Sequence, residues 1–388
     1  MSEVKFSSEE LARYSRHLIL PEFNIEGQKK LKQARVLVVG TGGLGAPLLL
    51  YLTAAGVGTI GMVDFDVVDD SNLQRQVLFT RDDIGVPKVL AARKRLEALN
   101  PYVKFITHQT ALSSDNALDI IKDYDVVADG TDNFPTRYLV NDACVLLGKV
   151  NVYASIYRFE GQATVFNYKN KAGELGPNYR DLFPSPPPPG LVPSCAEGGV
   201  LGVLPGILGS LQANEVIKVI SGVGETLSGR LFLFDASSFE TRTLKIKRRK
   251  DNPLNGENPT QLGLIDYQQF CGIGPDEHEE KTPVKSINVM QLNDLIQKRE
   301  SFQLIDVRES YEYDIANIKG ELMPKGDILQ YVPKIAQDKQ VIVHCRSGKR
   351  SADVIELLQE KYGFENLYNL EGGILAWAKE IDHAMPTY

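Results

Sequence analysis

From Arg35 onward, short stretches rich in β-branched residues alternate with longer helical stretches. The strand-like segment 35–40 precedes an apolar helical segment at 43–56, and a second strand-like segment at 59–66 precedes an amphipathic one at 88–101. This alternation predicts an α/β fold with a mostly parallel sheet that helices cover on both faces. Further expected strands are 103–107, 125–130, 150–155, 230–236 and 241–247, and further expected helices are 139–149 and 211–222.

The chain divides at the polar segment 251–283, which is rich in Gly, Pro and Asn and is predicted to be a linker. After it, strand-like segments at 302–308 and 341–345 and a helical segment at 350–362 indicate a smaller α/β unit. About a hundred residues suffice for an independent domain. Two domains are therefore expected, at 1–250 and 284–388.

Composition excludes several classes of protein. Apolar residues make up 43% and charged residues 24% of the 388 residues, which argues against a disordered chain. The net charge of −7 disfavours a protein that binds nucleic acid through a broad basic surface. The amino-terminal residues lack the apolar core of a signal peptide, and no apolar run reaches the roughly eighteen residues of a membrane span. The cysteines at 144, 195, 271 and 345 are too scattered for a disulfide framework, so a cytoplasmic protein without a membrane segment is expected.

A glycine-rich loop, GTGGLG at 40–45, joins the first expected strand to the first expected helix. Glycines there permit a tight turn and a close approach of the backbone to phosphates, which the helix amino terminus attracts. About twenty residues later, a pair of aspartates stands where a carboxylate would bind ribose hydroxyls. This pattern predicts a Rossmann-like nucleotide site; taken alone it favours NAD, with a glycine turn without ligand as the alternative. The expected contacts are Gly40, Gly42, Gly43, Gly45, Asp64 and Asp66.

Charged residues farther along point to a different nucleotide. Arg75 lies in SNLQRQ at 71–76, Lys88 begins an expected helix, and Asp132 lies in the turn GTDN after a strand. Two cations and a carboxylate around phosphates suit ATP with Mg²⁺ better than a hydride-transfer cofactor. Taken singly, each residue is as readily explained as a solvated surface charge.

Several spaced motifs occur together in the first domain. They are RYSRH (13–17), VLVVGTGGLG (36–45), VDFD (63–66), SNLQRQ (71–76), PKV (87–89), TDN (131–133), GQATVF (161–166) and SCAEGGVLG (194–202). With these motifs, residues 1 to about 250 resemble the MoeB/ThiF group, which is related to ubiquitin-activating enzymes. Members of this group adenylate the C-terminal Gly-Gly of small β-grasp sulfur-carrier proteins.

The resemblance implies roles for individual residues. Asp132 would hold Mg²⁺, and Arg16 would reach into the site of a neighbouring subunit as an arginine finger, so a homodimer would be the catalytic unit. Fixed cations such as Arg75 and Lys88 would stabilise the negative charge that develops when a carboxylate attacks the α-phosphate. The residues that would line the ATP site are Gly43, Asp64, Ser71, Asn72, Leu73, Gln74, Arg75, Lys88, Asp132 and Asn133.

The chain departs from this family at one point. Typical members carry two Cys-x-x-Cys pairs that bind a structural zinc ion. Here Asn178 and Asp181 stand where the first pair would fall, and the later stretch 250–260 contains no cysteine. Because no paired thiolates are available, no structural zinc is expected, and it stays open what braces this region.

Cys195 follows the proline-rich stretch 182–194 and precedes Glu197-Gly198-Gly199, which predicts an accessible loop. In fused relatives, the matching cysteine is proposed to accept the activated carrier as an acyl intermediate. The alternative is a small buried hydrophobe. Cys144 is expected in the core, and Cys271 is given no role.

A second reactive site is predicted in the smaller domain, where the strand 341–345 leads through a short loop into a helix. Cys345 would face backbone N–H groups, a helix amino terminus and three cationic side chains, which together stabilise a thiolate nucleophile. A phosphatase loop, Cys-x5-Arg, would require arginine at the position of Ser351, and the shorter loop present here suits a terminal sulfur. The loop residues after the cysteine are Arg346, Ser347, Gly348, Lys349 and Arg350.

With IDVRE (305–309) and LEGGILAW (370–377), the region from about 284 to 388 resembles a rhodanese domain. The resemblance implies that Cys345 carries a persulfide, whereas Asp306 and Arg308 are structural. A rhodanese fold without activity is the alternative, but it requires the loss of the cysteine.

Together the two domains resemble the fused, zinc-free MoeB–rhodanese proteins of some bacteria. Such a chain would use ATP and Mg²⁺ to activate a MoaD- or ThiS-like carrier and then convert its C-terminus to a thiocarboxylate, for molybdopterin, thiamine, cysteine or tRNA thiolation. The sulfur donor would be thiosulfate or a cysteine desulfurase, and direct nucleic-acid binding is not expected. Three alternatives remain: an NAD-dependent oxidoreductase with a rhodanese appendage, a ubiquitin-like-modifier activating enzyme that forms a thioester at Cys195, and a non-catalytic scaffold.

Overall fold

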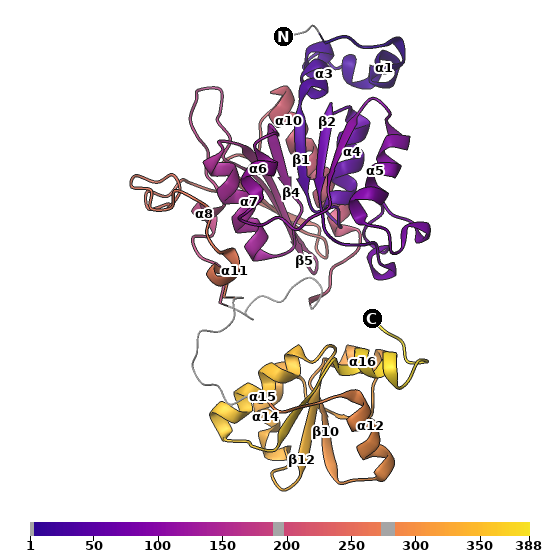
Figure 1. Cartoon of the computed structure of the whole chain (residues 1–388). Helices are drawn as coiled ribbons and strands as arrows, with labels where there is room; N and C mark the ends of the chain where they lie inside the picture. The colour runs from indigo at the N-terminus through magenta and orange to yellow at the C-terminus, as the bar shows by residue number, and fades with distance from the viewer. Residues whose placement is uncertain (1–3, 189–197, 273–283) are drawn as a thin grey trace. The chain divides into compact units, whose positions relative to one another are not determined.

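The computed structural model describes residues 4–188, 198–272 and 284–388 (Figure 1). The chain forms two compact units, Met1–Pro275 and Asp276–Tyr388, each with its own sheet and core. Among the described residues, no helix is both long and apolar enough to cross a lipid bilayer.

The first unit is built on an eight-stranded sheet in the order β3-β2-β1-β4-β5-β6-β7-β8. The first five strands in this order are parallel, and β6, β7 and β8 extend the sheet by antiparallel pairing. The predicted α/β fold with a mostly parallel, Rossmann-like sheet is confirmed. The strands are β1 Arg35–Val39, β2 Thr59–Val63, β3 Lys104–His108, β4 Val126–Asp129, β5 Val150–Tyr157, β6 Glu160–Phe166, β7 Arg230–Asp235 and β8 Glu240–Lys245.

Strand β1 shows why both faces of the sheet are covered. Successive side chains of a strand point to opposite faces, and every residue from Val36 to Val39 is buried. Val36 and Val38 lie in one core with α4, α5 and α10, whereas Leu37 and Val39 lie in a second core with α6 and α7. The helices of this unit are α1 Ser8–Arg13, α2 Ser15–Leu18, α3 Asn24–Gln33, α4 Gly45–Ala55, α5 Lys88–Leu99, α6 Ala117–Ile121, α7 Phe134–Leu146, α8 Tyr179–Leu182, α10 Leu204–Ser221 and α11 Tyr267–Phe270.

Two helices begin earlier than predicted: α7 at 134 rather than 139, and α10 at 204 rather than 211. Asn133 caps α7, since its Oδ1 accepts a hydrogen bond from Thr136 N at 3.0 Å. Pro135 and Pro205 stand in the first turns of α7 and α10. Proline is tolerated there because the missing N–H would have no partner inside the helix.

Residues 251–272, predicted as the first part of a linker, pack against the first unit. Helix α11 contacts α7 and buries Tyr267. The Tyr267 hydroxyl and Gln261 Nε2 both donate to Asp142 Oδ2 at 2.8 Å. Asp142 is fully buried and also pairs with Arg180 Nη2 at 2.6 Å. Polar residues that indicate a linker in the sequence thus satisfy a buried charge and join this segment to the sheet domain.

Replacing Asp142 with alanine is expected to lower the free energy of unfolding of the first unit by about 3–5 kcal/mol, because it leaves a buried guanidinium without its partner. Urea denaturation of the full chain, monitored by far-ultraviolet circular dichroism, measures the change in the free energy of unfolding. Asp251→Ala is the matched control, since Asp251 and its partner Arg249 form an exposed pair and such pairs contribute little. Equal stability of the two variants would contradict the assigned role of Asp142.

Asn178, Asp181, Asn252 and Asn255 form a hydrogen-bonded cluster, here called the polar bracket. Asn252 Nδ2 donates to Asn178 Oδ1 at 3.1 Å and to Asp181 Oδ1 at 2.7 Å, and Asn178 Nδ2 donates to Asn255 Oδ1 at 3.0 Å. The bracket occupies the place where the family resemblance puts zinc-binding cysteines. Within the described ranges, no group of three or more His, Cys, Asp or Glu side chains is arranged to hold a metal ion.

The second unit has a five-stranded sheet in the order β11-β10-β12-β13-β9, and all its pairs are parallel. The predicted smaller α/β domain is confirmed. Its strands are β9 Ser286–Ile287, β10 Phe302–Asp306, β11 Glu321–Leu322, β12 Gln340–His344 and β13 Leu367–Leu370, and its α-helices are α12 Val289–Lys298, α13 Ser310–Ile315, α14 Ile328–Tyr331, α15 Lys349–Tyr362 and α16 Gly373–Glu380.

Candidate active sites

The glycine-rich loop joins β1 to α4 at the carboxyl edge of the first sheet. Gly40 has a φ of +87°, and a Cβ at Gly45 would lie only 2.0 Å from the Gly40 carbonyl oxygen, so both positions require glycine. Thr41 donates its N–H and its hydroxyl to Asp64 Oδ2, each at 2.8 Å. The end of β2 therefore fixes the loop at the amino terminus of α4, where a phosphate would be attracted.

Lys88 and the two aspartates meet beside this loop. Asp64 Oδ1 accepts a hydrogen bond from Asp66 N at 2.9 Å. Lys88 Nζ lies 2.9 Å from Asp66 Oδ2, and the lysine side chain is 6% exposed whereas that of Asp66 is 50% exposed. Asp66 therefore holds the buried Lys88 ammonium at the edge of the sheet where open α/β folds bind nucleotides. A fixed cation at this edge can stabilise phosphate charge.

The segment 71–76 packs against the glycine loop. A Cβ at Gly43 would lie 3.8 Å from Arg75 Cγ, and one at Gly42 would lie 3.4 Å from Gln76 Nε2. Gln76 is buried, and its Oε1 has no hydrogen-bond partner among the described residues. Gln76 is one of the amide groups that the motif 71–76 supplies near the predicted nucleotide site, but it is not among the residues that the resemblance places at ATP. Of the other residues expected here, Ser71 and Gln74 are exposed, and Asn72 and Leu73 are partly buried.

Asp132 lies in the turn that follows β4, next to the glycine loop. The turn and the glycine loop are in close contact, as a Cβ at Gly40 would lie only 3.1 Å from the Gly130 carbonyl oxygen. Asp129, which the sequence analysis did not single out, shapes the turn: its Oδ1 accepts the Thr131 N–H at 3.0 Å and the Thr131 hydroxyl at 2.6 Å. Burial raises the pKa of Asp129. The carboxylate of Asp132 itself is exposed and thus available to a cation.

Arg16 lies at the opposite, amino edge of the same sheet. It is an exposed residue of α2, and α1–α3 lie beside the ends where β1 and β2 begin (Figure 1). Hydrogen bonds fix this arrangement, since Thr59 N donates to Ala34 O at 3.0 Å and Asn100 Nδ2 donates to the Tyr14 hydroxyl at 2.9 Å. A five-residue strand is about 16 Å long, so within one chain Arg16 is not part of the nucleotide site.

In the second unit, Cys345 lies at the start of the loop between β12 and α15. Its side chain is buried, and its Sγ accepts the Gly348 N–H at 3.1 Å. Gly348 adopts a φ of +95°, which turns that N–H toward the sulfur. The Ser351 hydroxyl lies 3.4 Å from Sγ and 2.6 Å from Asn369 Oδ1. One backbone N–H therefore donates to the sulfur, and a hydroxyl lies near it, in surroundings of the kind that stabilise a thiolate or persulfide.

Two helices hold this loop in place. α15 begins at Lys349, and α16 donates Ile374 N to Cys345 O at 3.0 Å and Leu375 N to Arg346 O at 3.2 Å. A Cβ at Gly373 would lie 2.4 Å from Cys345 O, so the close approach of α16 depends on that glycine. The loop geometry is thus set by residues almost thirty positions away in the sequence.

The loop arginines have different surroundings. Arg350 donates two hydrogen bonds to Glu312, at 2.6 and 2.7 Å. Burial alone would raise the pKa of Glu312, but hydrogen bonds from Arg350 and from Glu309 N outweigh it and hold the pKa below its usual value. Arg346 Nε donates to the main-chain oxygen of Tyr388 at 2.6 Å. The side chains of Ser347 and Lys349 are exposed.

Beneath the loop lies a buried charged pair. Arg308 donates to both carboxylate oxygens of Asp306, with Nη2 to Oδ2 at 2.5 Å, and both side chains are fully buried. His344 Nε2 lies 3.6 Å from Asp306 Oδ2. Burial lowers the pKa of His344 to about 4 despite this carboxylate, so the imidazole is neutral at physiological pH. The Asp306 carboxylate accepts its hydrogen bonds from the backbone N–H and the guanidinium of Arg308.

The other three cysteines are Cys144, Cys195 and Cys271. Cys195 lies outside the described residues. Cys144 and Cys271 are buried, and burial raises the pKa of the Cys271 thiol to about 11. Neither is a candidate nucleophile.

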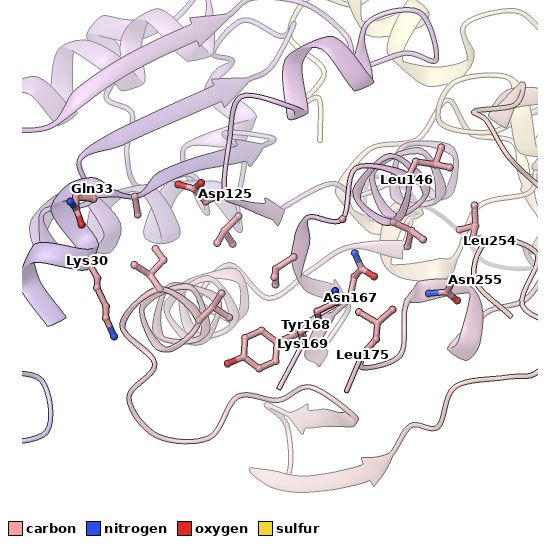
Figure 2. A pocket seen from close by; sticks show the side chains of 17 residues that line it. Lys30, Gln33, Asp125, Leu146, Asn167, Tyr168, Lys169, Leu175, Leu254 and Asn255 are labelled. Carbon is pink, nitrogen blue, oxygen red and sulfur yellow. The ribbon is translucent and has the colours of Figure 1, made fainter. Parts of the chain in front are cut away.

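A cleft of about 990 Å³ lies at the amino edge of the first sheet, away from the nucleotide edge (Figure 2). Ala34, Asp125 and Val150, which stand at or just before the starts of strands, line it together with Lys30 and Asn255.

Comparisons with known proteins agree with this organisation. The ThiF family matches residues 14–255, and the rhodanese-like domain matches residues 288–380. The chain is 50% identical over 385 residues to the probable adenylyltransferase/sulfurtransferase MoeZ of Mycobacterium tuberculosis, covering 98% of this chain and 96% of that protein. It is 55% identical over 270 residues to the sulfur carrier protein adenylyltransferase of Thermus thermophilus, covering 70% of this chain and all of that protein.

A further relative is the adenylyltransferase and sulfurtransferase MOCS3 of Culex quinquefasciatus, 42% identical over 402 residues, with 99% of this chain and 91% of that protein covered. Among solved structures, E. coli MccB with ATP has a TM-score of 0.55 at 22% identity, covering 63% of this chain and 74% of that one. At that identity the likeness concerns the fold.

Proposed function

Because the chain belongs to the ThiF family and also contains a rhodanese-like domain, we propose that it adenylates the C-terminal Gly-Gly of a small β-grasp sulfur-carrier protein and then transfers sulfur to it. The product is a thiocarboxylate on the carrier. The observation that carries the proposal is the presence, in one chain, of the glycine loop with its charged neighbours and of a cysteine in a cradle of donors. We further propose that the enzyme acts in the cytoplasm.

In the first reaction, the carrier carboxylate attacks the α-phosphate of ATP, and pyrophosphate leaves. Glycine-loop N–H groups and the amino terminus of α4 bind phosphate oxygens. Lys88 and Arg75 stabilise the negative charge that develops at the phosphorus. The support for Lys88 is its burial beside Asp66, and that for Arg75 is its position against Gly43.

Mg²⁺ is the metal this chemistry requires. When bound, it neutralises phosphate charge. We assign Asp132 to hold it, since an exposed carboxylate beside the glycine loop supplies the oxygen donors that Mg²⁺ prefers. Asn133 and the segment 71–74 complete the proposed nucleotide contacts.

In the second reaction, the persulfide on Cys345 attacks the activated carbonyl. When the persulfide attacks the acyl-adenylate directly, AMP leaves. If the acyl group first moves to Cys195, AMP leaves in that step and the Cys195 thiolate leaves in the next. Attack by the terminal sulfur gives an acyl disulfide with Cys345. A thiolate, either Cys195 or an external thiol, then takes the Cys345 sulfur into a new disulfide and releases the thiocarboxylate. A further thiol reduces that disulfide by thiol–disulfide exchange and is itself oxidised to a disulfide, and thiosulfate or the persulfide of a cysteine desulfurase then reloads the free Cys345 thiolate, with sulfite or the desulfurase thiolate as the leaving group.

We also propose that the enzyme is a homodimer in which Arg16 completes the site of the partner. The support is geometric, because Arg16 stands at the edge of its own sheet opposite the glycine loop. A cation supplied by the second copy would add to Arg75 and Lys88 during phosphoryl transfer.

Mixing Arg16→Ala with Asp132→Ala protein is expected to restore adenylation that neither variant has alone. A mixed dimer contains one site with both residues intact, so restored activity approaches about a quarter of the wild-type rate under random exchange. Pyrophosphate release in the presence of carrier measures it. Arg13→Ala, an exposed arginine on the neighbouring helix α1, is the control and should be active by itself. Failure of the mixture to regain activity would argue against the action in trans.

The function is tested by the intact mass of Gly-Gly-ended β-grasp proteins after incubation with the enzyme, Mg-ATP and thiosulfate. A mass increase of the carrier that corresponds to exchange of one oxygen for sulfur, and that requires both ATP and thiosulfate, is the expected result. ATP-dependent formation of a stable thioester without a thiocarboxylate would favour a ubiquitin-like-modifier activating enzyme. NAD binding without ATP binding would favour an oxidoreductase.

A further inference from the structure

Tyr388 lies against the rim of the sulfur loop. Its ring centroid is 5.7 Å from the guanidinium carbon of Arg346 and 5.9 Å from that of Arg308. Its main-chain oxygen accepts the hydrogen bond from Arg346 Nε at 2.6 Å. Its hydroxyl accepts a hydrogen bond from Arg308 and lies 3.4 Å from Glu312 Oε1. One residue thus contacts the loop position next to Cys345, the buried pair beneath the loop, and the carboxylate that holds Arg350.

The path of the chain brings Tyr388 to this place. After α16, Ile381 and Met385 pack against the core that includes Trp377. The chain therefore turns back along α16 instead of extending away from the domain. Tyr388 is only partly buried, whereas Cys345 is fully buried. Tyr388 therefore lies at the partly exposed surface next to Arg346, the loop residue that follows the buried Cys345.

These contacts are of a kind that can be made and broken readily. A ring over a guanidinium at a partly exposed site and single hydrogen bonds to a side chain are weak compared with the buried pair of Asp306 and Arg308. Arg346, which follows Cys345 directly, meets Tyr388 at a main-chain oxygen and at the face of its ring.

We propose that residues 386–388 are a displaceable cover of the sulfur loop, held by Arg346 and Arg308, that lifts before a sulfur donor or acceptor reaches Cys345. In the closed position, the cover protects a sulfane sulfur on Cys345 from free thiols, which would otherwise remove it as hydrogen sulfide and leave a disulfide. This device goes beyond the proposed function, because it concerns access to the cysteine and not the reaction that follows.

Tyr388→Ala is expected to raise the second-order rate constant for alkylation of Cys345 by iodoacetamide about tenfold, since the ring–guanidinium contacts and the hydroxyl contacts are lost together. The full chain is used, and the modified peptide is quantified by mass spectrometry. Tyr388→Phe removes only the hydroxyl contacts and should give an increase of about two- to threefold. A neutral reagent is chosen so that the local positive charge does not bias the result.

Tyr362→Ala is the matched control, since Tyr362 is an exposed tyrosine at the end of α15; it should leave the rate constant unchanged. Cys345→Ala identifies labelling at other cysteines. Rate constants within twofold of wild type for both Tyr388 variants would overturn the proposal. If Tyr388→Ala lowers the melting temperature, Tyr388→Phe decides, because it keeps the ring in place. The alkylation needs neither ATP nor a carrier, so its outcome is independent of the proposed function.

Discussion

Replacement of Cys345 by alanine should reduce sulfur transfer from thiosulfate to cyanide by a thousandfold or more while leaving adenylation intact. Loss of a nucleophile that forms the covalent intermediate typically removes rate factors of about 10³ to 10⁶. The structure supports this role because the sulfur accepts the Gly348 N–H just before the amino terminus of α15. Thiocyanate formation measures the first activity, and pyrophosphate release in the presence of carrier measures the second.

The control for this variant is Cys144→Ala, which removes a thiol buried in the first unit. It can lower stability, but it should keep thiocyanate formation by the second unit. Thiocyanate formation by Cys345→Ala at more than about one-hundredth of the wild-type rate would exclude Cys345 as the sulfur carrier. Loss of pyrophosphate release in the same variant would mean that adenylation depends on the sulfur loop.

Replacement of Asp132 by alanine should have the converse effect. We expect the rate of adenylation to fall by about a thousandfold, because the carboxylate that holds Mg²⁺ and the charge compensation it brings would be lost. Thiocyanate formation should remain unchanged, since it depends on the second unit alone. The same two assays, run side by side, measure both activities.

Strand β4 offers a matched control, because Asp123 is an exposed aspartate just before its amino end, whereas Asp132 follows its carboxyl end. Asp123→Ala changes the net charge equally but at the opposite edge of the sheet. It should keep nearly all of the adenylation activity. Retained adenylation in Asp132→Ala, or an equal loss in both variants, would refute the assigned role.

The sequence predicts those features that depend on short-range pattern. Burial of every residue from Val36 to Val39 follows from an apolar run between helical segments, and the spacing of Gly40 and Gly45 reflects a contact only five residues apart. The same holds for Gly348, whose N–H reaches a sulfur three residues earlier. In each case the partners are close in the chain, so a motif records their contact.

Other features depend on partners that are far apart in the chain. Glu312 binds Arg350 across 38 residues, and Tyr388 meets Arg308 across 80. No local pattern marks Glu312 or Tyr388 as part of the sulfur loop. Residues 251–272 were predicted as linker for the same reason, because their polar side chains satisfy Asp142, which lies more than a hundred residues earlier.

The polar bracket determines how this enzyme responds to changes in its chemical surroundings. A site of four thiolates around zinc opens when the metal is scarce or when an oxidant converts the thiolates to disulfides. The bracket joins the same two stretches through amide and carboxylate hydrogen bonds, which neither a chelator nor a peroxide attacks. A brace made of these hydrogen bonds therefore has no thiolate to oxidise and no zinc ion to lose, unlike one built from cysteine ligands.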